Sequence, residues 1–466
     1  MEAVLNFWEK HILETILCVK WLLIFWNYYL GFRQRALLKR LVDLPKSVEG
    51  LMSKDVYDKA RAYALDRNTF GIIQDAYINI YNTVSTMNTS MSSMYYIHEF
   101  ALMFLQLILV FYGYYYFWQW SIKIAKYCDF NHENEILISM ICMFIVGLVS
   151  HVANLPIAIY DTFVLEQKHG FNKQTTMFFI KDEIKKFVVG QILILPILNC
   201  VIWVVQNGGD YFFWYLWILF VVLSLFIMIL YPEIIAPLFD KYSPLPEGEL
   251  KQKIEELAAS LNYPLYKLFI VEGSKRSSHS NAYLYGFYKY KRIVLFDTLI
   301  KDYCKKDESD VDKEHGCETD EILAVLAHEL GHWKHNHAVK GFVLSQIILG
   351  ANFVVFAKLL RYTPMYSAFG FTDTEPILIG LFIVTMYILM PLNTIFSFIS
   401  IVISRKYEFQ ADRFATKLGH GDSLKAALLK LQKDNLGFPI YDKLYSCWNH
   451  SHPPTIERLE AVDKTQ

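Results

Sequence analysis

The sequence lacks several features that would assign it to a common class of protein. Its seven cysteines form no CxxC pair and no regular spacing, which argues against a disulfide framework or a cysteine-ligated metal site. The formal net charge is only -1, so there is no strong electrostatic case for binding nucleic acid. We find no internal repeat and no low-complexity tract. These absences exclude secreted disulfide-rich domains, basic nucleic-acid binders and repeat proteins.

Apolar residues, in contrast, are in surplus. The 466 residues are 54% hydrophobic and 16% aromatic, which is high for a soluble protein of this length. A helix of about 20 apolar residues crosses the hydrocarbon core of a membrane, which is roughly 30 Å thick. We therefore predict an α-helical polytopic membrane protein with about seven spans, at residues 11–30, 99–120, 137–160, 187–207, 211–232, 341–360 and 377–404.

Two of these spans need comment. The fourth contains Gln191, Pro196 and Asn199, so a buried or kinked helix remains an alternative there. The first lacks the short apolar core and the small-residue cleavage site of a signal peptide, and we expect it to be retained. Lysine and arginine gather after spans one, three and seven, which predicts an external N-terminus and a cytosolic C-terminus by the positive-inside rule.

Residues 241–320 change in character, since 27 of these 80 residues are charged. The stretch 248–263 has the pattern of an amphipathic helix, and 266–272 and 292–300 have the composition of strands. We expect a cytosolic α+β segment here. The predicted organisation is therefore spans one to five in 1–240, a cytosolic segment in 241–340, spans six and seven in 341–404, and a C-terminal part of the same cytosolic domain in 405–466.

The most informative stretch is AVLAHELGHWKHNH, residues 324–337. Apolar spacing predicts a helix that starts at an N-cap on Thr319, so His328 and His332 lie one turn apart on one face. Two imidazoles at this spacing can bind one zinc ion, and Glu329 between them can act as the general base of a metalloprotease. At about 100° per residue, neither His335 nor His337 points with the His328 and His332 pair, and we expect both to be solvated or interfacial.

A catalytic zinc ion needs a third protein ligand. The stretch RKYEFQADRFA after the seventh span places Glu408 and Asp412 one turn apart on a common helix face. Glu408 is the candidate third ligand, and Asp412 could orient a ligating histidine. A surface cluster of acids bridged to Arg405 and Arg413 is the alternative reading of the same spacing.

These motifs carry a resemblance. HELGH followed by EFQAD resembles the ExxxAD gluzincins of peptidase family M48, and the chain is most similar to the Ste24-type CAAX prenyl proteases. The matching blocks run in order through nearly the whole chain: LPIAIYDTFVLEQKHGFNKQT, RSSHSNAYLYGF, KRIVLFDT, HELGHWKHNH, EFQAD and SHPPTIERL.

The resemblance implies a zinc metalloendopeptidase with one zinc ion per chain, held by His328, His332 and Glu408, with Glu329 as the catalytic base. It implies a large chambered barrel of about seven transmembrane helices joined to a gluzincin-type domain. Asn281 matches a residue that holds the substrate backbone. His452 and Arg458 match residues near the site that could steady the oxyanion or the substrate carbonyl, and ordinary polar packing is the alternative for both.

The resemblance also implies a substrate and a location. Such enzymes remove the C-terminal tripeptide from farnesylated CaaX proteins, and some make a second cut upstream. They lie among the lipids of the endoplasmic reticulum and inner nuclear membranes, with the active site on the cytosolic or nucleoplasmic side. Two alternatives stay open from the residues: a site-2 type intramembrane protease, and a non-catalytic membrane scaffold that keeps a structural zinc site.

Overall fold

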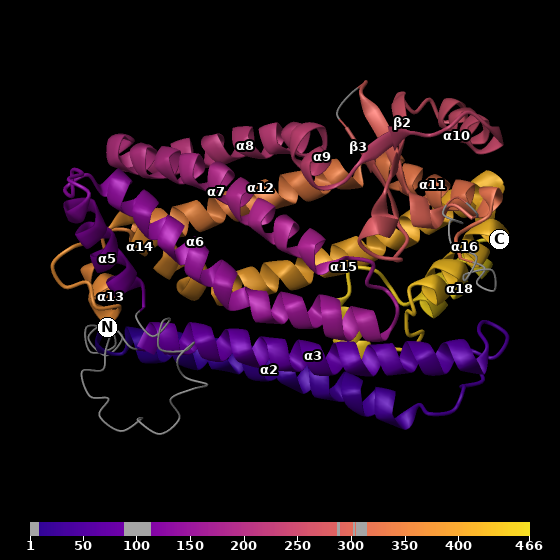
Figure 1. The fold of residues 1–466 in the computed structure, drawn as a ribbon, viewed down its shortest axis with the longest axis horizontal. Coiled ribbons are helices and arrows are strands. Elements are labelled where there is room, and N and C mark those ends of the chain that lie inside the picture. Colours follow the sequence, from indigo (N-terminus) through magenta and orange to yellow (C-terminus); the bar gives the residue numbers. More distant parts are fainter. Residues whose placement is uncertain (1–8, 88–112, 287–288, 302, 304–314) are drawn as a thin grey trace.

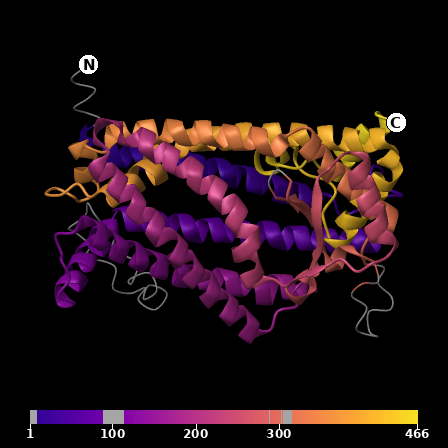
Figure 2. The same ribbon diagram turned by 90° about the horizontal axis from the view of Figure 1, so that it is seen from above.

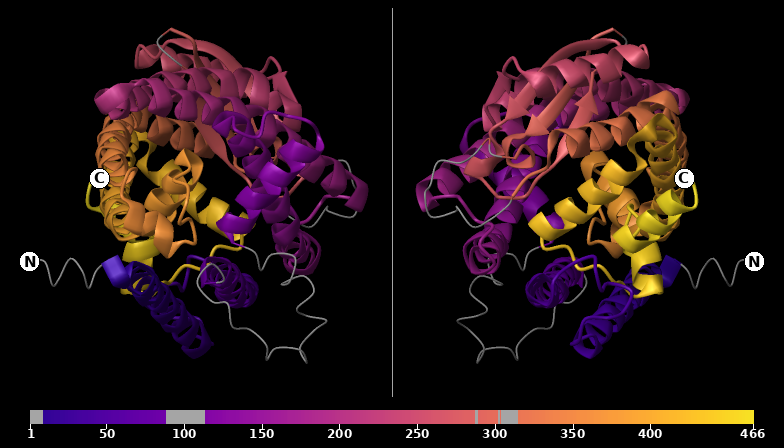
Figure 3. Two further views of the ribbon diagram at one scale, coloured as in Figure 1. Left: turned by 90° about the vertical axis from the view of Figure 1, so that its left-hand side faces the viewer. Right: turned by 90° about the vertical axis from the view of Figure 1, so that its right-hand side faces the viewer.

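Long helices and one small sheet make up the fold. The structure is a computed structural model that describes residues 9–87, 113–286, 289–301, 303 and 315–466. Two helices, α2 (Ile12–Arg40) and α3 (Lys54–Met87), lie side by side along one flank of the molecule (Figure 1). Seen from the ends, this pair lies on the side opposite the sheet, with the other long helices between them (Figure 3).

Five helices in the described part of the chain are long and apolar enough to cross a membrane. They are α2, α6 (Glu135–Tyr160) with its π-helical continuation to Glu166, α7 (Thr176–Asn207), the continuous run Gly209–Phe239 that contains α8 (Phe212–Leu230) and α9 (Ala236–Phe239), and α12 (His337–Leu359). These cover predicted spans one, three, four, five and six. The fourth is one continuous helix, with Pro196 inside it. The prediction of a helical polytopic membrane protein is confirmed.

The other two predicted spans differ from expectation. Residues 99–120 lie largely outside the described residues, and only the end is described, where α5 (Tyr114–Tyr127) begins. The span 377–404 is not one straight helix: α14 (Ile377–Ile383) and its π-helical extension meet α15 (Met390–Ala415) at a bend of 57°. Pro391, near the first residue of α15, has no backbone N–H to continue the preceding helix.

The helix α3 was not predicted, because its polar and apolar residues alternate without a long apolar run. It packs on α2 through a small core that includes Leu38 and Tyr57. The Arg61 side chain donates to the carbonyl oxygen of Leu38, and the Asn68 side chain donates to that of Gly31. These bonds satisfy polar groups on the face that α3 turns toward α2.

The sheet has four strands in the order β1-β2-β4-β3. Their bounds are β1 Tyr242–Pro244, β2 Leu265–Val271, β3 Ala282–Tyr285 and β4 Lys291–Phe296. The strands β2 and β4 are parallel, and β1 and β3 pair antiparallel to β2 and β4 respectively. The sequence predicted β2 and β4, whereas β1 and β3 are too short for a periodicity to show. Among the described strands, β3 is an edge strand that pairs only with β4.

One helix joins the sheet to the membrane part. The helix α11 (Thr319–Lys334) shares a core with β4 and with α10 (Glu249–Ser260), to which Ile322, Leu326 and Leu330 contribute. Its N-cap is Glu318, which forms a capping box with Glu321, so the predicted cap at Thr319 is wrong by one residue. Helix α16 (Gly421–Asp434) packs against α11, and α18 (Thr455–Asp463) packs against α16 and α15, at the same end of the molecule as the sheet (Figures 1 and 2). Helix α17 (Lys443–Asn449) contacts α2 and α15.

The helices α11 and α15 approach each other closely at Gly331. A Cβ atom at this glycine would lie 3.0 Å from the Cα atom of Ala411. A larger residue would therefore push the two backbones apart. Gly331 lies within HELGH and Ala411 within EFQAD, so the close contact brings the two motifs together.

Candidate metal centre

Three side chains converge where α11 meets α15. The Nε2 atoms of His328 and His332 lie 3.2 Å apart. The Glu408 carboxylate lies 3.3 Å from His332 Nε2 through Oε1 and 3.6 Å from His328 Nε2 through Oε2. One donor atom from each residue falls within 4.8 Å of the others. The structure therefore brings together the three residues that the sequence proposed as metal ligands.

Hydrogen bonds behind the two histidines fix the direction of their lone pairs. His328 Nδ1 lies 2.8 Å from Asp412 Oδ1, and a carboxylate can only accept, so the proton is on Nδ1. His332 Nδ1 lies 3.0 Å from His337 Nδ1, and His337 Nε2 lies 2.9 Å from the Gln410 side-chain oxygen. A proton on His337 Nε2 leaves its Nδ1 as an acceptor for His332. Both histidines then present Nε2 lone pairs to the same point.

This arrangement fits a metal ion. Without a cation, two lone pairs and a carboxylate would face one another, which is unfavourable. Glu408 is only 3% exposed, so the charge of its carboxylate is held largely out of water. Two neutral imidazoles and one carboxylate are the donor set of catalytic zinc sites that keep one position open. The donor set and its burial point to a bound divalent cation.

The expectation that His337 is solvated or interfacial is wrong. The side chain is buried at 5% exposure, whereas His335 is exposed as expected. The expectation assumed that the helix continues past His335. Instead α11 ends at Lys334, and Asn336 adopts a left-handed conformation with a φ of 55° that turns the chain into α12. His337 is therefore the first residue of a new helix, and its side chain lies against that of His332.

We predict that His337→Ala weakens metal binding without abolishing it. The substitution removes the group that holds His332 in its tautomer and orientation, and loss of such an outer partner typically lowers metal affinity by about 10- to 100-fold. Competition with a metal-sensitive dye measures the affinity. His335→Ala, on the exposed neighbour, is the matched control and should bind metal like the wild type. Equal affinity in both variants would contradict the role of His337.

An arginine side chain that is only 11% exposed lies behind the three convergent side chains. Arg458 donates to Asp412 through Nε at 2.8 Å and through Nη2 at 2.6 Å. Its Nη1 atom lies 3.6 Å from Glu408 Oε2. Burial opposes the charge of Arg458, but the hydrogen bonds and charge of Asp412 raise its pKa above the ordinary value. The guanidinium therefore stays charged and holds two carboxylates of α15 in place.

Two further candidates lie at the front of the site. Glu329, next to His328 on α11, is half-buried, and its charge acts on both Arg458 and His452. His452 is 68% exposed, with Nδ1 2.8 Å from Glu408 Oε2. Interaction with the Glu408 carboxylate raises the pKa of His452. A carboxylate and an imidazole thus border the position where the three side chains converge.

Asn281 lies at the start of the edge strand. Its side chain is exposed, and its Oδ1 atom accepts from the backbone N–H of Ala282 at 2.8 Å. Its carbonyl oxygen accepts from the N–H of Phe296 on β4. The strand β3 that follows contacts α11, which carries His328 and His332. One edge of this strand has no paired strand among the described residues.

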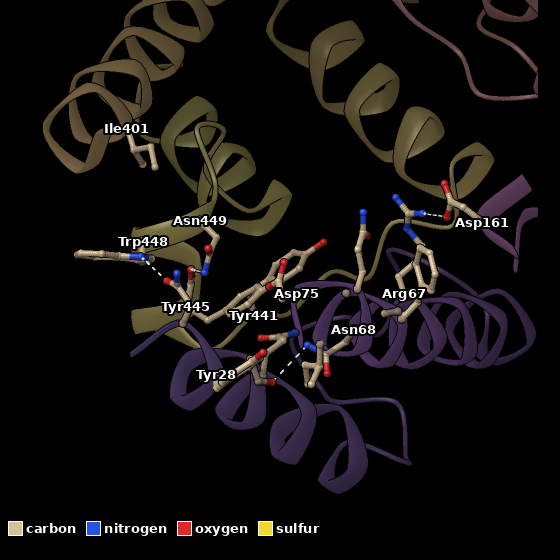
Figure 4. A pocket seen from close by; sticks show the side chains of 18 of the residues that line it. Tyr28, Arg67, Asn68, Asp75, Asp161, Ile401, Tyr441, Tyr445, Trp448 and Asn449 are labelled. Carbon is tan, nitrogen blue, oxygen red and sulfur yellow. Dashed lines mark hydrogen bonds and ion pairs between the residues drawn. The ribbon is translucent and has the colours of Figure 1, made fainter. Parts of the chain in front are cut away.

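The structure also contains a large cavity that the sequence did not locate. It measures about 1380 Å³ and is lined by α2, α3, α6, α15 and the chain around α17. Figure 4 shows its polar side chains, which include Tyr28, Asn68 and Asp75 and the ion pair of Arg67 with Asp161. The cavity is distinct from the three convergent ligands, none of which lines it.

The combination defines a class of protein. A bundle of membrane helices carries a small mixed sheet, with an HExxH helix packed against that sheet and a buried glutamate supplied by a second helix. This is the architecture of a membrane metalloprotease. The HExxH helix packs against the sheet and is not one of the apolar helices, which differs from the site-2 alternative, where the motif lies inside a hydrophobic span.

Comparison with known proteins identifies the family. Residues 85–241 match the family described as CAAX prenyl protease N-terminal, five membrane helices, and residues 244–466 match peptidase family M48. The proteins called CAAX prenyl protease 1 homolog from Homo sapiens and Mus musculus are each 43% identical to this chain, over 97% of it and 96% of their own length. The crystal structure of S. mikatae Ste24p has a TM-score of 0.80 and 34% identity, and covers 98% of this chain and 99% of its own.

The chain belongs to the CAAX prenyl protease 1 family of M48 metallopeptidases. The family resemblance and the enzyme class inferred from the sequence are thereby confirmed.

Proposed function

We propose that this protein is a zinc endopeptidase that removes the C-terminal tripeptide from prenylated CaaX proteins. The observation that carries the proposal is the convergence of His328, His332 and Glu408 beside Glu329. A purely structural metal site has no need of an adjacent base. The names of the human and mouse relatives supply the substrate class, since both are CAAX prenyl proteases.

The residues divide the reaction among them. A zinc ion held by His328, His332 and Glu408 would supply Lewis acidity at the scissile carbonyl. Glu329 takes a proton from the attacking water and returns it to the leaving amine. His452, whose pKa is raised, donates to the carbonyl oxygen as it gains negative charge. The open edge of β3, with Asn281 at its start, pairs with the substrate backbone.

In our proposal, Arg458 and Asp412 mainly hold the proposed metal ligands in place. Asp412 accepts from His328, and Arg458 neutralises Asp412 and Glu408. The contact of Arg458 with substrate that the sequence comparison suggested stays a prediction. The division of the chain into four parts at residues 240, 340 and 404 also remains a proposal. So does a second upstream cleavage of some substrates.

The location follows from the same proposal. Basic residues after spans one, three and seven favour an active site on the cytosolic side of the membrane. The family resemblance implies the endoplasmic reticulum membrane and the inner nuclear membrane, which is continuous with it. A prenyl chain leaves water favourably, by about 0.8 kcal/mol for each buried CH₂ group. Membrane lipid is therefore the expected surroundings of the enzyme and of its substrate.

The decisive experiment uses the full chain purified in detergent. We expect about one zinc ion per chain, release of a C-terminal tripeptide from a farnesylated CaaX peptide, and loss of that activity on chelation that zinc restores. Mass spectrometry of the peptide and elemental analysis of the protein measure both. Bound zinc without cleavage of either prenylated or plain peptide would favour the scaffold alternative.

A further inference from the structure

The residues just before the edge strand are held by the membrane helices. We call Arg276–Ser280 the leading segment, because it runs directly into Asn281 and β3. Arg276 makes two hydrogen bonds of 2.8 Å to Asp182 in α7 and one of 2.6 Å to Asp240, just after α9. The main chain of the leading segment bonds to the loop between α6 and α7, where the N–H of Ser278 donates to the carbonyl oxygen of Phe171. The leading segment is thus attached to helices far from it in sequence.

A second attachment comes from a single amide side chain. The Oδ1 atom of Asn435 lies 3.0 Å from His279 Nδ1 and accepts the Ser280 backbone N–H at 3.1 Å. The His279 ring also stacks on Phe171, with ring centroids 4.0 Å apart, and its Nε2 atom lies 3.3 Å from Glu166 Oε2. One oxygen therefore holds the two consecutive residues that precede Asn281.

Asn435 also belongs to the wall of the large cavity. Asn435 and Leu436 line it, together with Tyr63, whose hydroxyl donates to Glu166. Leu436 has a φ of 47°, in the left-handed region that usually takes glycine at the end of a helix. A leucine there is strained, and such strain is commonly retained at functional positions. The turn after α16 thus contacts the cavity on one side and the leading segment on the other.

We propose that Asn435 and His279 are positioning residues that fix the start of β3, and with it Asn281, to the wall of the cavity. The inference rests on the proposed function in one respect: β3 is taken as the strand that pairs with the substrate peptide. A peptide can pair along β3 only if the strand is held in place over α11. Loss of the attachment therefore weakens peptide binding, whereas the metal ligands, which make no contact with Asn435 or His279, stay in place.

The test compares two substitutions at Asn435. Asn435→Leu removes the acceptor oxygen at similar volume, and Asn435→Asp retains it. For Asn435→Leu we expect faster hydrogen exchange of the β3 amides and a KM about tenfold higher, with kcat within about twofold, because pairing along a strand contributes equally to the ground and transition states. Zinc content should equal that of the wild type. Asn435→Asp should resemble the wild type in all four measurements.

The control and the second variant lie in the same cluster. His169→Phe alters a histidine that packs on Tyr63 and bonds to Asp66 but does not touch the leading segment. We expect wild-type KM and wild-type exchange of β3 in this control. If Asn435→Leu fails to fold, His279→Phe replaces it, since it keeps a ring on Phe171 and loses the bond to Asn435.

Two results would overturn the positioning role. One is unchanged β3 exchange and KM in both Asn435→Leu and His279→Phe, and the other is an equal effect in His169→Phe. A wild type that cleaves no prenylated peptide would instead refute the proposed function. The exchange measurement still decides the positioning role in that case, because it needs no substrate.

Discussion

Glu329→Gln is expected to lower kcat by about a thousandfold while the protein keeps its metal. Glu329 is not one of the three convergent ligands, and the substitution changes only its ability to take and return a proton. General base catalysis typically contributes about 10²- to 10⁴-fold to a rate. The glutamine keeps the size and a hydrogen-bonding oxygen, so the packing of α11 should not change. Tripeptide release from a farnesylated peptide and zinc content by elemental analysis measure the two effects.

The matched control is another acidic residue on the same helix. Asp320 lies in the first turn of α11 with a side chain that is 74% exposed. Asp320→Asn removes one negative charge from α11, as Glu329→Gln does, and should leave kcat and zinc content unchanged. A Glu329→Gln enzyme with more than a tenth of wild-type kcat would assign the base to another group.

The sequence predicted the parts of this protein that depend on local pattern. His328 and His332 share a face because four residues make about one helical turn. The apolar runs identified five spans that are long apolar helices in the described part of the structure, and predicted span four is a continuous helix despite Pro196. Glu408 was proposed as the third ligand from its spacing from Asp412 and from the family resemblance, although it lies 76 residues beyond His332.

The features that sequence could not predict depend on how distant segments meet. His337 was misplaced because a left-handed residue, Asn336, ends the helix where apolar spacing gave no sign of an end. The short strand β3 exists through pairing with β4, since four residues are too few to form a strand alone. Asn435 reaches His279 across 156 residues, and no local pattern marks such a contact.

The His328 and His332 pair needs a third ligand, and Glu408→Gln is expected to abolish both metal retention and turnover. The carboxylate supplies the negative charge nearest to both Nε2 atoms, at 3.3 and 3.6 Å. A neutral amide is a much weaker ligand for zinc. Its loss also leaves the buried guanidinium of Arg458 with Asp412 as its remaining carboxylate partner in the site, and a buried charge that loses a partner is costly. We therefore expect a lower melting temperature as well.

Comparison of the two glutamate variants separates their roles. Glu408→Gln should purify without stoichiometric zinc, whereas Glu329→Gln should retain it, and both should be inactive. The control on α15 is Arg413→Gln, because Arg413 is exposed and its side chain bonds only to a carbonyl oxygen of its own helix among the described residues. This control should keep zinc and turnover. Zinc bound at one ion per chain in Glu408→Gln, with wild-type affinity, would mean that the third ligand is another residue and that the carboxylate serves only to balance Arg458.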